Sequence, residues 1–165
     1  MIGDLDERAH AGPRPECPGD RSLLDRCRGP ALEVGSGPGR LTVALAERGV
    51  PVLGIDIRPG VVAAARSAGA LVMLRDVFGR VPGAGRWMTV LLAGRTIRIG
   101  GDPAALLRRA GELLAPQGRA LVELAPPVGA DRIAAVARDA GLGQVETWTA
   151  GGRWFACLAR AGLRR

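Results

Sequence analysis

The stretch "LEVGSGPGRLTVALAERGVPVLGIDI" runs from Leu32 to Ile57 and carries glycines at three alternate positions, Gly35, Gly37 and Gly39. An apolar run precedes the glycines, and a run with helical spacing, a second apolar run and Asp56 follow them. This order predicts a strand, a glycine turn, a helix and a second strand. It is typical of nucleotide-handling units, because glycines let the backbone approach a ligand and a helix N-terminus offers free N–H groups.

The alternation of apolar and amphipathic runs continues to the C-terminus. We expect a short helix at 21–27, further strands at 70–75, 87–93 and 119–124, and helices at 59–69, 102–115 and 132–140, with a turn at 116–118. Gly151 and Gly152 separate two strand-like runs, which predicts a β-hairpin. Residues 21–165 are therefore predicted to form one α/β domain. Its Rossmann-like, doubly wound sheet is mostly parallel and seven-stranded, with helices on both faces and an antiparallel C-terminal hairpin.

Composition narrows the function classes. The chain has 165 residues and a net charge of +7, yet every basic residue is an arginine and the arginines are interleaved with acids. Without a basic run or an aromatic cluster, we do not expect nucleic-acid binding. No apolar stretch is long enough to span a bilayer or to form a signal peptide, and the three cysteines form no CxxC pair. We expect a cytoplasmic protein without a membrane partner or a metal, and residues 1–20 as a poorly ordered arm.

The residues around the glycine turn indicate which nucleotide fits. A P-loop is excluded because the chain has no lysine, and a dinucleotide fingerprint is disfavoured because Arg40 stands where the third glycine belongs. Glu33 puts a carboxylate at the mouth of the turn, which repels a pyrophosphate and attracts a cation. Asp56, at the end of the second strand, is placed to accept hydrogen bonds from ribose hydroxyls. These features predict a nucleoside with a cationic tail.

The sequence resembles the class I S-adenosylmethionine-dependent methyltransferases. The resemblance rests on "LEVGSGPGR", "GIDI", "RDVFGRVPGAGRW", "TVLLA" and "LLAPQGRALVEL", in this order, over roughly residue 23 to the C-terminus. The chain is most similar to small actinobacterial-type members with "GGDP" before the fourth helix. The resemblance implies that the cofactor is S-adenosylmethionine and that it is bound by Glu33, Gly35, Gly37, Gly39, Asp56, Ile57, Asp76, Val77, Leu92 and Ala93.

The resemblance also implies a role for each position. Glu33 would hold the amino group of the methionyl end, and Asp56 the ribose. Ile57 would pack on the adenine, Asp76 would accept from the adenine amino group, and the Val77 N–H would donate to the ring. Backbone groups near Leu92 and Ala93 would meet the amino acid tail. Two structural alternatives remain: a glycine turn can be architecture alone, and Asp76 can simply cap a turn.

The acceptor side departs from the family pattern. In "AGRTIRIGGDP" the places where similar proteins carry an acid and an amide are Gly94 and Thr96, and Arg95 and Arg98 replace small residues. Either Arg95, Thr96 and Arg98 bind an anionic small-molecule acceptor, or the arginines are solvated loop residues of a protein whose methyl-transfer site has decayed.

Two functional hypotheses follow. The chain is a methyltransferase acting on a small molecule, or it is a catalytically inactive methyltransferase-like binding or partner protein. No residue is indicated as a general base, because the one histidine, His10, lies in the arm. We expect Trp87, Trp148 and Trp154 to pack against the sheet rather than line an acceptor pocket. The sequence gives no indication of the oligomeric state.

Overall fold

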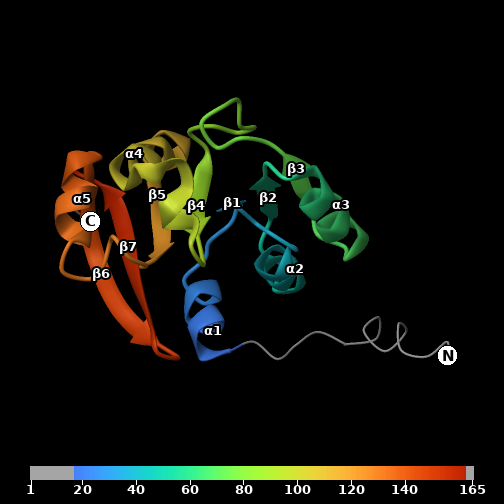
Figure 1. The fold of residues 1–165 in the computed structure, drawn as a ribbon, viewed down its shortest axis with the longest axis horizontal. Coiled ribbons are helices and arrows are strands. Elements are labelled where there is room, and N and C mark those ends of the chain that lie inside the picture. Colours follow the sequence, from blue (N-terminus) through green and yellow to red (C-terminus); the bar gives the residue numbers. More distant parts are fainter. Residues whose placement is uncertain (1–16, 163–165) are drawn as a thin grey trace, which may run out of the picture.

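The computed structural model describes residues 17–162, which form one seven-stranded sheet in the order β3-β2-β1-β4-β5-β7-β6 (Figure 1). The strands are β1 (Ala31–Val34), β2 (Val52–Asp56), β3 (Val72–Leu74), β4 (Trp87–Leu92), β5 (Leu114–Glu123), β6 (Leu142–Ala150) and β7 (Arg153–Arg160). β1 to β5 run parallel, and β7 is antiparallel to both of its neighbours, β5 and β6. The strand order reverses between β1 and β4, so the predicted doubly wound α/β fold is confirmed.

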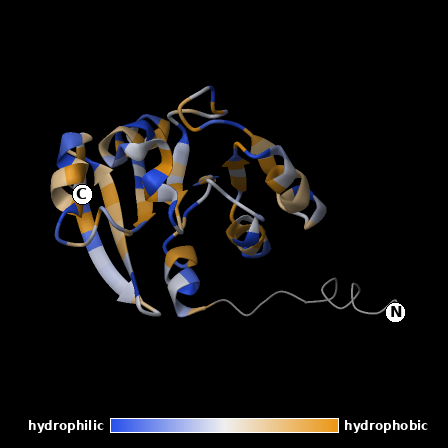
Figure 2. Ribbon diagram, in the orientation of Figure 1, coloured by the Kyte–Doolittle hydropathy of each residue, from blue (hydrophilic) through white to orange (hydrophobic). Residues whose placement is uncertain are grey.

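Helices cover both faces of this sheet (Figure 1). They are α1 (Pro18–Leu24), α2 (Arg40–Glu47), α3 (Pro59–Ser67), α4 (Pro103–Leu113) and α5 (Ile133–Asp139). Neighbouring residues of β4 point to opposite sides: Leu91 packs with residues of α1 and α2, whereas Val90 and Leu92 pack with residues of α4 and α5. In Figure 2 the central strands are accordingly mostly hydrophobic, and the helices alternate between hydrophobic and hydrophilic residues.

Three features of the fold differ from the sequence-based expectation. The first helix begins at Pro18 rather than at residue 21, so the predicted arm is shorter than expected, and its residues 1–16 lie outside the described part of the chain. The predicted turn at 116–118 lies inside β5, where the pairing with β4 shifts register next to Trp87. A Cβ on Gly118 would stand 2.5 Å from the Trp87 carbonyl oxygen, so this close approach requires glycine. An unpredicted 3₁₀ helix, η1 (Thr96–Gly101), follows β4.

The predicted C-terminal hairpin is confirmed. Gly151 and Gly152 form its two-residue loop with φ values of +58° and +74°, which is the combination that a type I′ turn requires. Trp148 of β6 stacks on Phe155 of β7 with ring centroids 5.3 Å apart, and its indole N–H donates to Ser22 Oγ of α1. The hairpin thus ties the N-terminal helix to the sheet.

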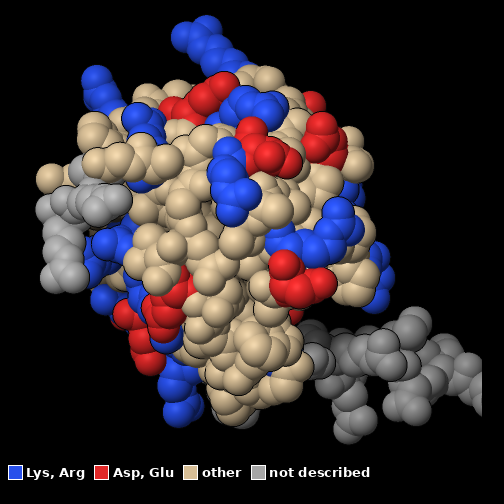
Figure 3. All heavy atoms as spheres, turned by 90° about the vertical axis from the view of Figure 1, so that its left-hand side faces the viewer, with Lys and Arg blue, Asp and Glu red and all other residues tan. Residues whose placement is uncertain are grey.

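The surface beside this hairpin mixes both signs of charge. On the face that carries α5 and β6, basic and acidic side chains are interspersed among uncharged ones (Figure 3). Within residues 17–162, no helix is long and apolar enough to cross a membrane.

Candidate functional site

A pocket of about 440 Å³ opens at the carboxyl ends of β1, β2, β3 and β4. We call it the strand-end pocket. Its walls are residues 33–38, 40–41, 55–58, 75–77 and 93–96, together with Ile99. Because β1 and β4 are the strands between which the order reverses, the pocket lies at the topological switch point, where doubly wound sheets bind their ligands.

The glycine turn, residues 35–39, connects β1 to α2 at this pocket. Gly35, Gly37 and Gly39 all have positive φ, at +65°, +56° and +84°. Gly35 and Gly37 line the pocket, as predicted, but Gly39 does not. A Cβ on Gly39 would stand 2.5 Å from the Cβ of Ala70, so this glycine lets the turn pack against the segment between α3 and β3. The structure therefore gives Gly39 a packing role, and its predicted contact with the cofactor stays a prediction.

Glu33 of β1 contributes its carboxylate to the pocket wall while remaining only 4% exposed. Its Oε2 accepts a 2.6 Å hydrogen bond from Thr42 Oγ1 of α2. Burial is the main cause that raises the pKa of Glu33 to about 7, against the opposing effects of the Thr42 bond and the nearby Arg40 charge. A cation bound in the pocket would favour the ionised form of Glu33 and lower this pKa again.

Asp56, the last residue of β2, lies beside the glycine turn. Its Oδ2 accepts from the Gly37 N–H at 3.1 Å, and both carboxylate oxygens accept from Arg58. These Arg58 bonds are the main reason why the pKa of Asp56 is lowered from its ordinary value. Asp56 is therefore an ionised acceptor at the place where the sequence predicts the ribose. Arg58 was not predicted at the site, although it lies two residues after the end of β2. The rule that ligands bind beyond the carboxyl ends of the strands, which we call the strand-end rule, could have found it.

The residues predicted around an adenine also lie in the pocket wall. Ile57 is 66% exposed there, an unusual exposure for an isoleucine that a flat ring packed on it would relieve. Asp76 and Val77 follow β3 and line the same pocket. Asp76 Oδ1 accepts from the Phe78 N–H at 2.9 Å, so the alternative of a capped turn is realised. The adenine contacts of Asp76 and Val77 stay predictions.

The end of β4 and the loop after it carry the residues predicted to meet the amino acid tail and the acceptor, and only some of these residues line the pocket. Ala93 lines the pocket, whereas Leu92 is fully buried in the core and is not part of the wall. The predicted contact between backbone groups near these two residues and the amino acid tail stays a prediction. Arg95 lines the pocket, but Arg98 does not: its Nε donates to the Pro126 carbonyl at 2.6 Å. The Thr96 hydroxyl is directed into its own loop, where it donates to the Ala93 carbonyl at 2.5 Å. Of the predicted acceptor cluster, Arg95 and Thr96 thus line the pocket and Arg98 does not, and the acceptor contacts of Arg95 and Thr96 stay predictions.

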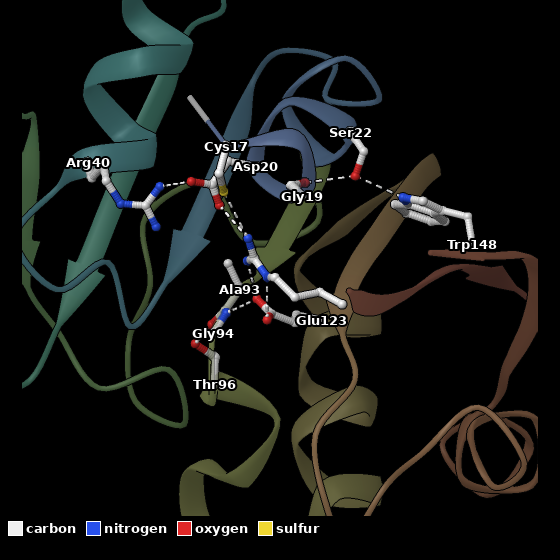
Figure 4. A network of polar contacts seen from close by, with 11 residues as sticks. Cys17, Gly19, Asp20, Ser22, Arg40, Ala93, Gly94, Thr96, Glu123 and Trp148 are labelled. Carbon is white, nitrogen blue, oxygen red and sulfur yellow. Dashed lines mark hydrogen bonds and ion pairs between the residues drawn. The ribbon is translucent and has the colours of Figure 1, made fainter. Parts of the chain in front are cut away.

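A chain of charged residues holds the rim of the pocket together (Figure 4). Arg40, next to the glycine turn, pairs with Asp20 of α1, and Asp20 accepts from Arg153 of β7 at 3.0 Å. Arg153 also donates to both oxygens of Glu123, at 2.8 and 2.7 Å. Glu123 Oε2 in turn accepts from the Gly94 N–H at 2.6 Å, at the start of the loop that carries Arg95. We call Arg40, Asp20, Arg153, Glu123 and Gly94 the rim network.

The rim network was not predicted from the sequence. Asp20 is only 3% exposed, although it lies in the segment predicted as a poorly ordered arm. Its burial raises its pKa, but the bonds from Arg153 and Cys17 and the charge of Arg40 outweigh that effect, so the pKa is lowered overall. Glu123 ends β5 and could have been found by the strand-end rule, whereas the Asp20–Arg153 contact joins residues 133 positions apart and leaves no local signal.

The donor set of the pocket fits a nucleoside with a cationic tail. Two carboxylates, on Glu33 and Asp56, stand on adjacent parallel strands beside a glycine turn open to backbone approach. Ser36 lies in this turn, and its hydroxyl is the one buried side-chain oxygen or nitrogen without a hydrogen-bond partner among the described residues. A buried hydroxyl without a partner is unusual, and Ser36 is one of the residues that line the pocket. Within residues 17–162, no cluster of three or more His, Cys, Asp or Glu side chains could hold a metal ion.

The comparisons with known proteins identify a family. Residues 31–118, more than half of the chain, match the family model described as "Methyltransferase domain". A curated relative, the ubiquinone biosynthesis O-methyltransferase of Azorhizobium caulinodans, is 34% identical over 96 residues, which are 55% of this chain and 38% of the relative. The matched part is thus well under half of that relative's length.

Solved structures show the same fold. An S-adenosylmethionine-dependent methyltransferase from Bacteroides fragilis, in complex with S-adenosyl-L-homocysteine, is 21% identical with a TM-score of 0.72, over 86% of this chain and 76% of that chain. NcsB1, an O-methyltransferase from neocarzinostatin biosynthesis in complex with S-adenosyl-L-homocysteine and 1,4-dihydroxy-2-naphthoic acid, is 20% identical with a TM-score of 0.64, over 79% of this chain and 48% of that chain. The family match, the fold and the strand-end carboxylates together show that the chain belongs to the class I S-adenosylmethionine-dependent methyltransferases, which use S-adenosylmethionine as their cofactor.

Proposed function

We propose that the chain transfers a methyl group from S-adenosylmethionine to a small-molecule acceptor that carries a negative charge. The observation that carries the donor half is the pair of buried carboxylates, Glu33 and Asp56, which face one pocket from β1 and β2. When bound, S-adenosylmethionine supplies a methyl group on a sulfonium, which a nucleophile displaces in line. The task of the protein is then to hold both partners in near-attack geometry in a cleft poor in water.

The chain's own residues divide this task. Glu33 would hold the ammonium of the methionyl end, Asp56 the ribose hydroxyls, and the segment 75–77 with Ile57 the adenine. Gly35 and Gly37 leave room for the backbone to approach the tail. Each proposed contact lies at or near a strand end, as the switch-point geometry requires.

The acceptor half rests on Arg95. Its side chain lines the strand-end pocket from the loop after β4, and it forms no ion pair with an acidic residue in the described part of the chain. A guanidinium recognises carboxylate or phosphate through paired N–H donors. NcsB1 was solved with a naphthoic acid, which is a small aromatic carboxylic acid and thus of the class proposed here.

The proposal includes a cytoplasmic location, which is supported by three cysteines that are all free in the structure.

The alternative function is that of an inactive methyltransferase-like binding protein. It is favoured by the loop after β4, where Thr96 turns its hydroxyl inward and Arg98 binds the Pro126 carbonyl. A second observation favours it too. The carboxylates that line the pocket are Glu33, Asp56 and Asp76, and all three are assigned to the donor. An active enzyme would therefore have no dedicated base here, and its acceptor would lose its proton to water.

The test is methyl transfer from labelled S-adenosylmethionine to a panel of small aromatic carboxylates, phosphate esters and neutral phenols. The variants are Arg95→Ala and, as the matched control from the same loop, Arg98→Ala. We expect transfer to an anionic acceptor with a KM that Arg95→Ala raises about tenfold or more, as loss of a charge-assisted pair predicts, while Arg98→Ala behaves as wild type. Donor binding without transfer to any acceptor would favour the binding protein. Equal effects of the two variants would rule out Arg95 as the acceptor contact.

A further inference from the structure

The carboxylate of Asp56 is already fully hydrogen-bonded. Its Oδ1 accepts from the Arg58 backbone N–H and from Arg58 Nε, each at 3.0 Å. Its Oδ2 accepts from the Gly37 N–H at 3.1 Å and from Arg58 Nη2 at 3.0 Å. An ionised carboxylate offers about four lone-pair sites, so four donors use all of them. Two ribose hydroxyls arriving at Asp56 therefore meet an occupied acceptor.

Of these four donors, two can leave without rearranging the fold. The Gly37 N–H is fixed by the glycine turn, and the Arg58 N–H is fixed at the start of α3. The Arg58 guanidinium, in contrast, belongs to a side chain that is 62% exposed, whereas the Asp56 side chain is 3% exposed. The guanidinium can swing into water, where it is well hydrated. It then frees one lone pair on each oxygen, which matches the two adjacent hydroxyls of a ribose.

We propose that Arg58 is an internal competitor for the donor's ribose, which closes the ribose subsite by pairing with Asp56 and opens it when the nucleoside displaces the guanidinium. This inference rests on the proposed function, because the displacing ligand is the donor nucleoside. The apparent affinity for the donor is reduced by the fraction of molecules in which Arg58 has not left. Arg58 thereby sets donor affinity without contacting the reacting atoms.

The same exchange makes the subsite selective for ribonucleosides. Two O–H donors replace two N–H donors, so Asp56 remains fully hydrogen-bonded in the complex. A 2′-deoxynucleoside would supply one donor for the two that leave and would strand a buried carboxylate lone pair, which is costly. Arg58 thus raises the requirement for both hydroxyls, since a ligand that lacks one does worse than the guanidinium it replaces.

The inference is tested by calorimetric titration with S-adenosylhomocysteine, which has no sulfonium, so that the loss of one arginine charge changes its binding little through electrostatic repulsion alone. The proteins are wild type, Arg58→Ala, Asp56→Ala and Asp56→Ala/Arg58→Ala. Arg80→Ala is the control, because Arg80 is an exposed arginine of the loop after β3 that lies outside the pocket.

We expect Arg58→Ala to bind about two- to fivefold more tightly than wild type, because the exposed Arg58 guanidinium is well hydrated when it leaves and its pairing with Asp56 is only modestly favourable. Arg80→Ala should bind as wild type does. In the Asp56→Ala background, removing Arg58 should change nothing, because the pair that competes no longer exists.

Each contrary result is distinguishable. If wild type binds and Arg58→Ala binds equally or more weakly, the competitor role is wrong and the proposed donor site stands. If Arg58→Ala and Arg80→Ala tighten binding alike, the effect is one of net charge and the inference also fails. If neither wild type nor Arg58→Ala binds, the inference and the proposed function fall together.

Discussion

Thr42 Oγ1 donates a 2.6 Å hydrogen bond to Glu33 Oε2 beside the glycine turn, and both side chains are buried. Burial, the main cause, raises the pKa of Glu33 from an ordinary 4.5 to about 7. The donor's ammonium requires the ionised carboxylate, so we expect affinity for S-adenosylmethionine to fall as the pH drops below about 7, by up to about tenfold per unit. Calorimetric titration between about pH 5.5 and 8.5 measures this, with Glu33→Gln as the variant that should lose the dependence. A flat profile in wild type would refute the assignment of Glu33.

The raised pKa of Glu33 also affects stability, and its pH dependence has the opposite sign to that of a carboxylate with a lowered pKa. Because the folded-state pKa of Glu33 lies above its unfolded value, its contribution is fully present below about pH 4.5 and is lost as the pH rises through about 7. The unfolding free energy of wild type should therefore fall between about pH 4 and pH 8, whereas that of Glu33→Gln should not. We expect the difference between the two proteins to grow by ~3 kcal/mol over this range, in favour of Glu33→Gln. Urea denaturation of both proteins at these two pH values measures the difference, and parallel behaviour would contradict the raised pKa.

Substitutions at two glycines of the turn distinguish the stability cost of backbone strain from the cost of steric crowding. Gly37 has φ +56° and open space where a Cβ would lie, whereas Gly39 has φ +84° and a Cβ there would stand 2.5 Å from the Cβ of Ala70. We expect Gly37→Ala to lose about 1 kcal/mol of stability, from the left-handed backbone alone. Gly39→Ala should lose about 2–4 kcal/mol, because overpacking adds to the strain. Thermal and urea denaturation compare the two, and equal losses would show that Gly39 is not a packing position.

The rim network predicts unequal roles for two glutamates that both pair with arginine. The Glu123 side chain is 13% exposed and the Glu146 side chain 46% exposed in their pairs with Arg153 and Arg26. We expect Glu123→Ala to reduce stability by about 2–3 kcal/mol, because it leaves the Gly94 N–H without its partner and removes two of the hydrogen bonds of Arg153, which then keeps only Asp20 as an acidic partner. Glu146→Ala should cost less than about 1 kcal/mol. A Glu123 variant as stable as the Glu146 variant would show that the network does not hold the rim.

The sequence alone predicts the sheet and most of the pocket, for a physical reason. Period-two and period-3.6 patterns indicate strands and helices, and parallel strand ends meet at one edge, so Glu33 and Asp56 had to lie close together once the fold was known. The turn expected at 116–118 was wrong because Gly118, which locally resembles a turn residue, instead allows β5 to approach the Trp87 carbonyl.

The remaining features depend on contacts that no local pattern encodes. Arg95 and Arg98 are three residues apart in one loop, yet the 3₁₀ helix directs Arg98 to the Pro126 carbonyl and leaves Arg95 at the pocket. The burial of Asp20 depends on Arg153, which lies at the far end of the chain. The pairing of Arg58 with Asp56 depends on which of several conformations the arginine side chain adopts, and sequence spacing alone does not decide this.

The central claim is that Asp56 holds the ribose of S-adenosylmethionine at the end of β2. Calorimetric titration of S-adenosylmethionine into wild type, Asp56→Ala and Glu146→Ala tests it most directly, since the Glu146 carboxylate lies outside the strand-end pocket. We expect wild type and Glu146→Ala to bind with the same micromolar affinity and Asp56→Ala to bind about tenfold or more weakly, as loss of a charge-assisted hydrogen bond predicts. Equal affinities in all three proteins, or no binding to wild type, would contradict the claim and leave the glycine turn as architecture alone.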